Sequence, residues 1–159
     1  MNNINDAITI TFPDGKTKEY DKGITGYEIA ESIAKSLAKI AIAVSVDNIQ
    51  KDLSDSINSD SSISIITLEN DEGLEIMRHT LTAQVLAKAI KNLYPLAKLA
   101  IGPTIDNGFY YDVSFEKQIS SEDLPKIEKE MNKIIKNGST INKTIHSKED
   151  AIKLFNERN

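Results

Sequence analysis

The side chains that could take part in chemistry are few, and most of them lie near the middle of the chain. His79 is followed five residues later by Gln84, and the second histidine, His146, is distant in the sequence. Five residues of an ideal α-helix turn about 500°, so the His79 and Gln84 side chains would lie about 140° apart. Thr80 and Gln84, four residues apart, would share one face. A regular helix therefore does not bring His79 and Gln84 to one substrate.

Other kinds of site find no support in the residue types. The chain has no cysteine, which excludes disulfides, thiolate metal ligands and a thiol nucleophile within it. Two isolated histidines match no zinc-ligand spacing, so we expect no metal site and interpret His146 as an ordinary histidine. No phosphate-cradling glycine loop or P-loop pattern is present.

A turn-rich segment follows the histidine and glutamine. Gly102-Pro103 and Asp106-Asn107-Gly108 have the composition of tight turns. The next residues, 109–113, read as a strand, in which Phe109 and Tyr111 would share one face. From residue types alone, these residues could form turns and pack in the core, or they could contact a ligand.

The first half of the chain is predicted to be a small α+β unit that ends near Leu68. Residues 7–12 alternate apolar and polar side chains, and Pro13-Asp14-Gly15 is typical of a turn, so residues 7–20 are predicted to form a β-hairpin. Thr25 and Glu28 have capping-box spacing. They precede apolar residues at helical spacing, which are Ile29, Ile33, Leu37 and Ile40. Residues 40–46 and 61–68 are rich in β-branched side chains and are predicted to be strands.

The second half is predicted to begin with a linker and a long helix. Residues 69–73 are polar and acidic, which indicates a break between domains 1–68 and 69–159. An amphipathic helix is expected from about Leu74 to Tyr94, ended by Pro95. Its apolar stripe consists of Leu74, Met77, Leu81, Val85, Ala89 and Leu93, widened by Leu86 and Ile90.

Two further helices are expected after the turn-rich segment. The first would be capped by Ser120 or Ser121 and would end near Gly138. Its inner face would consist of Leu124, Ile127, Met131 and Ile134. The charges between Lys126 and Lys136 are interpreted as a solvated face. A short last helix is predicted over about residues 148–156.

The overall composition limits the partners of the chain. It has 40% hydrophobic and 27% charged residues, which is ordinary for a soluble globular protein. No apolar run approaches the ~20 residues that span a bilayer, and the N-terminus has no signal-peptide pattern, so we expect a cytoplasmic protein that contacts no membrane. The net charge of −5 predicts weak binding of nucleic acid by the chain alone.

The order of these elements and several motifs resemble the bacterial threonyl-tRNA synthetase family. Pro13-Asp14-Gly15, the helix after Thr25 and the strand at 61–68 resemble a TGS domain, a ubiquitin-like β-grasp module. The segment Asp71–His79 resembles the junction between the TGS and editing domains of that family. Ala100–Asp112, which reads Ala-Ile-Gly-Pro-Thr-Ile-Asp-Asn-Gly-Phe-Tyr-Tyr-Asp, closely resembles the next stretch of the editing domain. The resemblance implies an α+β fold: a β-grasp domain followed by part of an editing domain.

The resemblance implies a function and a set of site residues. Members of this family charge threonine tRNA with threonine using ATP, and their editing domain hydrolyses seryl-tRNA. Their ATP, magnesium and zinc sites belong to a catalytic domain outside this chain, so no cofactor is expected here and no DNA partner is implied. Aligned from the residues before it, His79 would fall at the first editing histidine. Aligned back from Pro95, Thr80 would fall there and Gln84 at the second. Residues expected to line the pocket are Thr80, Gly102, Pro103, Asp106, Asn107 and Tyr111.

This chain departs from the family pattern in its long helix. The family carries an H-x-x-x-H pair there, with a later Cys and His, whereas this sequence ends at Asn159, before that later segment. Between His79 and Pro95 it has one residue more than the family. A π-bulge, with i→i+5 bonding, can absorb such an insertion. We therefore predict a π-bulge near residues 79–84 that brings His79 and Gln84 nearer to one face.

Three interpretations remain open from the sequence. The chain is expected to be the N-terminal part of a threonine–tRNA ligase, with no threonylation and negligible deacylation by itself. Alternatively, it is a stand-alone, non-catalytic RNA- or protein-binding module, or a decayed relative. In each case apolar positions left uncovered on the long helix would favour self-association.

Overall fold

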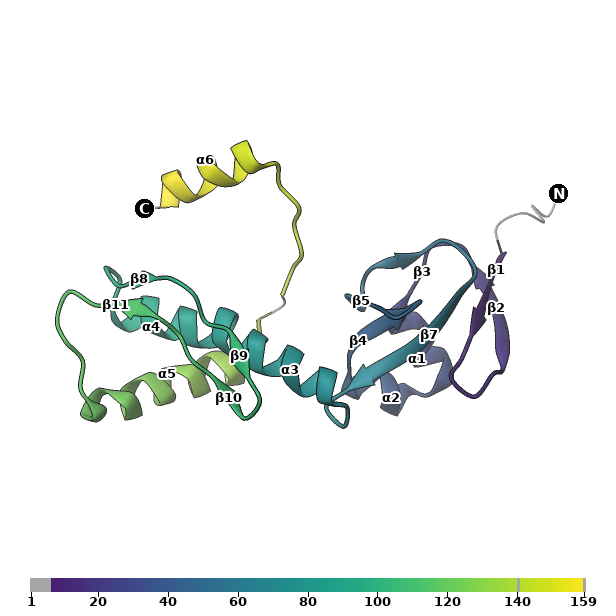
Figure 1. Ribbon diagram of the computed structural model, residues 1–159, viewed down its shortest axis with the longest axis horizontal. Coiled ribbons are helices and arrows are strands. Elements are labelled where there is room, and N and C mark those ends of the chain that lie inside the picture. Colours follow the sequence, from purple (N-terminus) through teal and green to yellow (C-terminus); the bar gives the residue numbers. More distant parts are fainter. Residues whose placement is uncertain (1–6, 140, 159) are drawn as a thin grey trace.

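The computed structural model describes residues 7–139 and 141–158. A five-stranded sheet with two short helices forms the first unit, and a long helix leads from it to the second unit (Figure 1). The second unit packs a further helix and short β-ribbons against the long helix. The C-terminal helix α6 (Lys148–Arg158) stands apart from both units in Figure 1.

The sheet of the first unit has the strand order β2-β1-β7-β4-β5. The central pair β1 and β7 is parallel, and the other neighbours are antiparallel. The strand bounds are β1 Ala7–Thr11, β2 Thr17–Asp21, β4 Ala41–Val46, β5 Ile49–Lys51 and β7 Ser61–Thr67. A separate two-stranded pair joins β3 (Ile24–Thr25) to β6 (Ser56–Ile57). This mixed sheet with a helix across it is the predicted α+β architecture.

The predicted hairpin over residues 7–20 is confirmed. The Phe12 amide donates to the Lys16 carbonyl at 2.8 Å, and the Gly15 amide donates to the Phe12 carbonyl at 2.9 Å. Gly15 has φ +79°, a conformation that favours glycine because it has no Cβ. The turn residues therefore set the register of β1 on β2.

The helical part of the first unit differs from the prediction. The capping box is present: the Glu28 amide donates to the Thr25 hydroxyl, and the Thr25 amide donates to the Glu28 carboxylate. However, Ala34 is extended (φ −161°), so the helix divides into α1 (Gly26–Ile33) and α2 (Lys35–Ile40). The predicted apolar stripe is divided with it. Ile29 is fully buried, whereas Ile33, the last residue of α1, is 50% exposed.

The core of the first unit lies between α1 and the sheet. Its buried cluster consists of Ile8, Ile10, Ile29, Val44, Val46, Ile57 and Ile63. β-Branched side chains pack well on a pleated surface, which is why isoleucine and valine fill this layer.

The junction predicted as a linker is a tight turn into the long helix. Helix α3 (Asp71–Thr80) begins inside the predicted linker, three residues before Leu74. The Asn70 side-chain oxygen accepts a 2.9 Å hydrogen bond from the Thr67 amide. Gly73 is buried, and a Cβ there would collide with the Thr67 carbonyl oxygen. Close backbone packing therefore joins α3 to the end of β7.

The long helix contains the predicted π-bulge. A π segment, η1 (Leu81–Leu86), separates α3 from α4 (Ala87–Leu93), and the Ala87 amide donates to the Thr82 carbonyl five residues earlier. The segment lies slightly further along the chain than the predicted range of 79–84. Tyr94 ends the helix before Pro95, as expected. The predicted stripe is buried only in part, since Leu74, Met77 and Leu93 are about 40% exposed.

Short ribbons and a second helix cover the long helix. Instead of one strand at 109–113, two short pairs form: β8 (Lys98–Leu99) with β11 (Val113–Ser114), and β9 (Thr104–Ile105) with β10 (Gly108–Phe109). Ser120 caps a short 3-10 turn (Ser121–Asp123) that leads into α5 (Leu124–Asn137). Ile127 of α5 is buried, but Leu124, predicted on its inner face, is 56% exposed.

Candidate functional site

A cleft of about 420 Å³ lies where the long helix meets the segment before β9. The helix contributes three residues on its α3–η1 portion, and the opposite wall comes from residues 100–104 and Tyr111. The lining residues are His79, Thr82, Ala83, Ala100, Ile101, Gly102, Pro103, Thr104 and Tyr111. The predicted turn segment and the predicted histidine therefore meet in one cleft.

Backbone hydrogen bonds hold the wall opposite the helix. The Ala100 amide donates to the Asp112 carbonyl at 3.0 Å, and the Asp112 amide donates to the Ile101 carbonyl at 2.8 Å. The Tyr110 amide donates to the Pro103 carbonyl at 3.3 Å. These bonds bridge the gap between the two short ribbons, so Tyr111 is fixed beside Gly102.

Gly102 allows the two walls to approach. A Cβ built on Gly102 would collide with the Tyr111 ring and would lie 2.8 Å from the Thr82 Cγ2 atom. A glycine is needed here for space, since neither its φ nor a turn demands one. The sequence analysis explained Gly102 as a turn residue, and this explanation was wrong. Gly102 was also predicted to line the pocket, and it does line the cleft.

Thr82 is a cleft residue that the sequence analysis did not single out. Its side chain is 1% exposed, and its hydroxyl donates to the Arg78 carbonyl at 2.8 Å. This bond satisfies the only side-chain donor of Thr82 within its own helix. A threonine inside an apolar helical stripe gives no sequence signal by itself, because its burial depends on the segment packed against it.

The other predicted site residues lie outside this cleft. Thr80 is half-buried and Gln84 is exposed, and neither is among the cleft's lining residues. The π segment exists, but it does not place Gln84 beside His79 in the cleft. Asp106 and Asn107 line a separate hollow of about 590 Å³ with the first turns of α3, where Asp71, Glu72 and Glu75 make the surface acidic.

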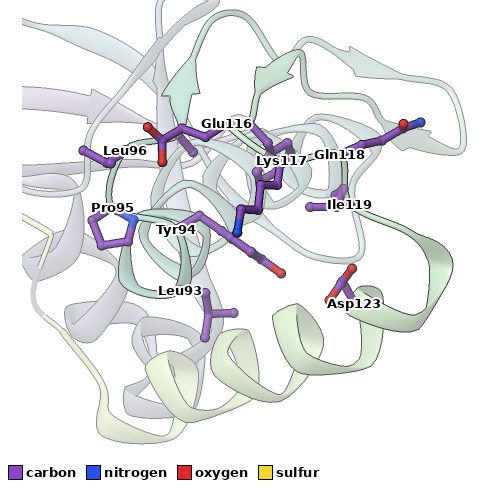
Figure 2. Close-up of a pocket in the computed structure, with 11 residues that line it drawn as sticks. Leu93, Tyr94, Pro95, Leu96, Glu116, Lys117, Gln118, Ile119 and Asp123 are labelled. Carbon is purple, nitrogen blue, oxygen red and sulfur yellow. The ribbon is translucent and has the colours of Figure 1, made fainter.

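A third hollow, of about 580 Å³, lies at the C-terminal end of the long helix (Figure 2). Tyr94 and Phe115 meet there edge to face, with ring centroids 5.2 Å apart. Figure 2 shows Tyr94 extending toward Asp123 at the start of α5. The Ser120 amide donates a hydrogen bond to the Asp123 carboxylate and lowers its pKa. The Lys126 ammonium also donates a hydrogen bond to this carboxylate and lowers the pKa further.

The described residues do not fit a metal centre. Within residues 7–139 and 141–158, no three or more His, Asp or Glu side chains gather where they could hold an ion. The cleft offers the His79 imidazole, the Tyr111 phenol and backbone polar groups. Such a set can orient a small polar ligand or a water, but it contains no activated nucleophile.

Comparisons with known proteins agree with this architecture. Residues 8–67 match the family model described as the TGS domain. The first unit is therefore a TGS domain, a ubiquitin-like β-grasp fold. No helix in the described part of the chain is long and apolar enough to cross a membrane.

The similarity to whole proteins extends well beyond the first unit. Threonine–tRNA ligase of Francisella philomiragia is 49% identical over 148 residues, which are 93% of this chain and 23% of that protein. Those of Acetivibrio thermocellus and Geobacillus sp. (strain WCH70) are each 49% identical over 96% and 97% of the chain. Nearly the whole chain is thus similar to the N-terminal region of threonine–tRNA ligases, and it spans about a quarter of their length.

Proposed function

We propose that this chain is the N-terminal part of a threonine–tRNA ligase. On this proposal the whole protein charges threonine tRNA with threonine, using ATP, and removes serine attached by mistake. The observation that carries the proposal is the 49% identity over 93–97% of the chain. ATP, magnesium and zinc would serve a synthetic site outside residues 1–159. A cytoplasmic location follows from a role in translation.

The cleft beside Gly102 is the proposed place for the amino-acid end of a mischarged tRNA. Serine lacks one methyl group of threonine, and such a group contributes only about 1–3 kcal/mol of discrimination, so a second, hydrolytic site is useful. His79 would orient the attacking water or accept its proton. Gly102 and Tyr111 would form the wall against which the amino acid lies.

The first test is the intact mass of the native polypeptide in the source cell, detected through peptides from this chain. A product several times larger than 17.6 kDa is expected if the chain is part of a ligase. A product near 17.6 kDa would overturn the proposal.

The second test concerns the cleft and uses the native full-length product. His79→Ala is expected to slow hydrolysis of seryl-tRNA about 100-fold or more, because a positioned acid–base group contributes about 10²–10⁴-fold. His146→Ala is the matched control, since His146 is exposed and lies outside the helices and strands. Equal rates for both variants would remove His79 from the proposal and leave the ligase assignment standing.

A non-catalytic binding module is the alternative function. The position of Gln84 outside the cleft favours it, because His79 then lacks its partner on the helix. This module would retain tRNA without hydrolysing seryl-tRNA. Under either function, the chain of residues 1–159 is expected to bind immobilised tRNA and to hydrolyse seryl-tRNA no faster than buffer does. The mass of the native polypeptide therefore decides between the two functions.

Self-association of the chain is a further part of the proposal. On the long helix, the apolar positions Leu74, Met77 and Leu93 are each about 40% exposed. Exposed apolar surface of this kind favours contact with another molecule. Sedimentation of residues 1–159 is expected to show a concentration-dependent mass, and a sharp monomer would contradict it.

A further inference from the structure

Four lysines form a stripe along one side of α5. Their spacing of three, four and three residues places them within an arc of about 80° on an ideal helix. They are Lys126, Lys129, Lys133 and Lys136, and all four are exposed. Together with Leu93 of α4 they border a hollow of about 640 Å³. The stripe is about 15 Å long, since each residue rises 1.5 Å.

Only two of these four lysines form ion pairs with described residues, and both pairs are exposed to solvent. Lys126 pairs with Asp123 at 3.0 Å and Lys133 with Glu130 at 3.5 Å, and both lysine side chains are more than 65% exposed. Exposed pairs of this kind contribute little and are easily exchanged. Lys129 and Lys136 form no ion pair with any residue that the structure describes. Two cations are therefore free and two can change partner.

The stripe leads to an aromatic surface. Leu93 borders both the lysine hollow and the hollow in Figure 2, so the two lie next to each other at this residue. Tyr94, Phe115 and Lys117 line the second hollow, and the Lys117 side chain extends toward Tyr94 in Figure 2. The two hollows together carry five lysines and three carboxylates, in a chain whose net charge is −5. The positive charge is thus local to this surface.

We propose that the α5 lysine stripe and the Tyr94 hollow form a binding surface for the phosphate backbone of single-stranded RNA. Such surfaces combine a row of cations along the backbone with aromatic rings on which bases stack. Four to five stacked nucleotides, at about 3.4 Å each, match the length of the stripe. The lysines would contact phosphates, and the Tyr94 ring would contact a base.

This inference deepens the proposed function and rests on it for the choice of RNA over other polyanions. The RNA surface is distinct from the cleft at Gly102, so either proposal can be wrong while the other stands. A short RNA without an amino acid tests the stripe alone, and hydrolysis of seryl-tRNA by the His79→Ala variant tests the cleft.

The experiment measures binding of a fluorescein-labelled, single-stranded RNA of about 12 nucleotides, within the usual site sizes. Fluorescence anisotropy is recorded with the chain of residues 1–159 at several salt concentrations. Four phosphate contacts predict a slope of log K against log salt of about −2.8. A slope near zero, or no binding at low salt, would overturn the proposal.

The decisive variant replaces the two unpaired lysines, Lys129→Gln with Lys136→Gln. It is expected to weaken binding about 25-fold at 0.1 M salt and to reduce the slope by about 1.4, because two contacts are lost. Lys35→Gln with Lys39→Gln on α2 is the matched control: both lysines are exposed and the net charge changes equally. An equal loss in the control would show that overall charge, and not the stripe, binds RNA.

Two further measurements separate RNA from other partners. Tyr94→Leu is expected to weaken binding several-fold at an unchanged salt slope, and Tyr94→Phe is expected to retain it, because stacking needs the ring. Labelled polyglutamate is the second probe. If it binds as tightly as the RNA, and Tyr94→Leu leaves both affinities unchanged, the surface takes an acidic peptide and the RNA proposal is wrong.

Discussion

The two units of the chain bury very different amounts of apolar surface. Within residues 7–70, eleven hydrophobic side chains are buried and five large ones are exposed. Within the described part of residues 71–158, four are buried and thirteen large ones are exposed. The first unit thus has a core of its own, whereas the second is held by a long helix, two ribbons and α5.

The buried core that stabilises the chain and the candidate sites therefore lie in different units. The cleft, the acidic hollow and the lysine stripe all lie in or beside the second unit. Few buried contacts permit local opening at a low free-energy cost, and binding regions are commonly found where such opening occurs. The first unit anchors the second through α3, whose start packs against the end of β7 at Gly73.

The largest expected effect is loss of the core of the first unit. Ile29→Ala should lower the free energy of unfolding by about 2–5 kcal/mol, because it leaves a cavity beneath α1. Ile33→Ala, on the same helix but 50% exposed, is the control and should change it by less than about 0.5 kcal/mol. Urea unfolding followed by circular dichroism measures both. Equal losses would mean that α1 continues regularly past Ala34, with Ile33 buried.

The junction between the units should show the next largest effect. Gly73→Ala places a Cβ against the Thr67 carbonyl, and two backbones must shift, at a cost of about 1–3 kcal/mol. Glu75→Ala on the exposed side of α3 is the control. Thermal unfolding gives the loss, and hydrogen exchange shows whether the two units still unfold together. An unchanged midpoint for Gly73→Ala would indicate a loose junction.

Each unit contains one capping box, which allows a direct comparison of helix starts. Thr25→Ala in the first unit and Ser120→Ala in the second should each cost about 0.5–2 kcal/mol. The loss should be larger for Thr25, because its helix covers the buried core. Unfolding in urea would measure both variants. A larger loss for Ser120→Ala would reverse the order of stability that we infer for the two units.

The same caps predict a dependence of stability on pH. The Thr25 amide and hydroxyl hold the pKa of Glu28 below its ordinary value of 4.5, and the Ser120 amide, with Lys126, holds that of Asp123 below 3.8. A lowered pKa stabilises the fold above the unfolded value, and this contribution disappears as the pH falls through the folded value. Melting temperatures should therefore fall below about pH 4.5, and less steeply for Glu28→Gln.

The smallest effect on stability is expected from deleting Ala83. A π-bulge accommodates one extra residue, so its removal should restore a regular helix and leave α3 and α4 in phase, with a change within about 0.5 kcal/mol. The deletion also places Gln84 four residues after His79, on the same face. Thermal unfolding measures the stability. A loss above about 2 kcal/mol would show that the bulge itself is needed to pack η1.

The local elements could largely be predicted from the sequence. Gly15, the Thr25 capping box, Pro95 and Ser120 each act within a few residues, and each produced the expected turn, cap or helix end. The division of the helix at Ala34 was missed, because no glycine or proline marks it. Ile33 and Ile40, which continue the helical spacing from Ile29, are the last residues of the two short helices and are exposed.

The candidate site was predicted in part. His79, Gly102, Pro103 and Tyr111 do line one cleft. Asp106 and Asn107 form the turn between β9 and β10 and line another hollow. Thr82 was missed, because its burial depends on the approach of Gly102 from a segment twenty residues away.

The sequence by itself determined the kinds of elements, their order and the presence of an extra residue in the long helix, since these depend on propensities and spacing over a few residues. Only the tertiary structure decided where that residue is absorbed, which face of the helix meets the Gly102 segment, and why Gly102 must be a glycine. Those outcomes depend on packing between segments distant in sequence, where a single added atom at Gly102 would collide with Tyr111.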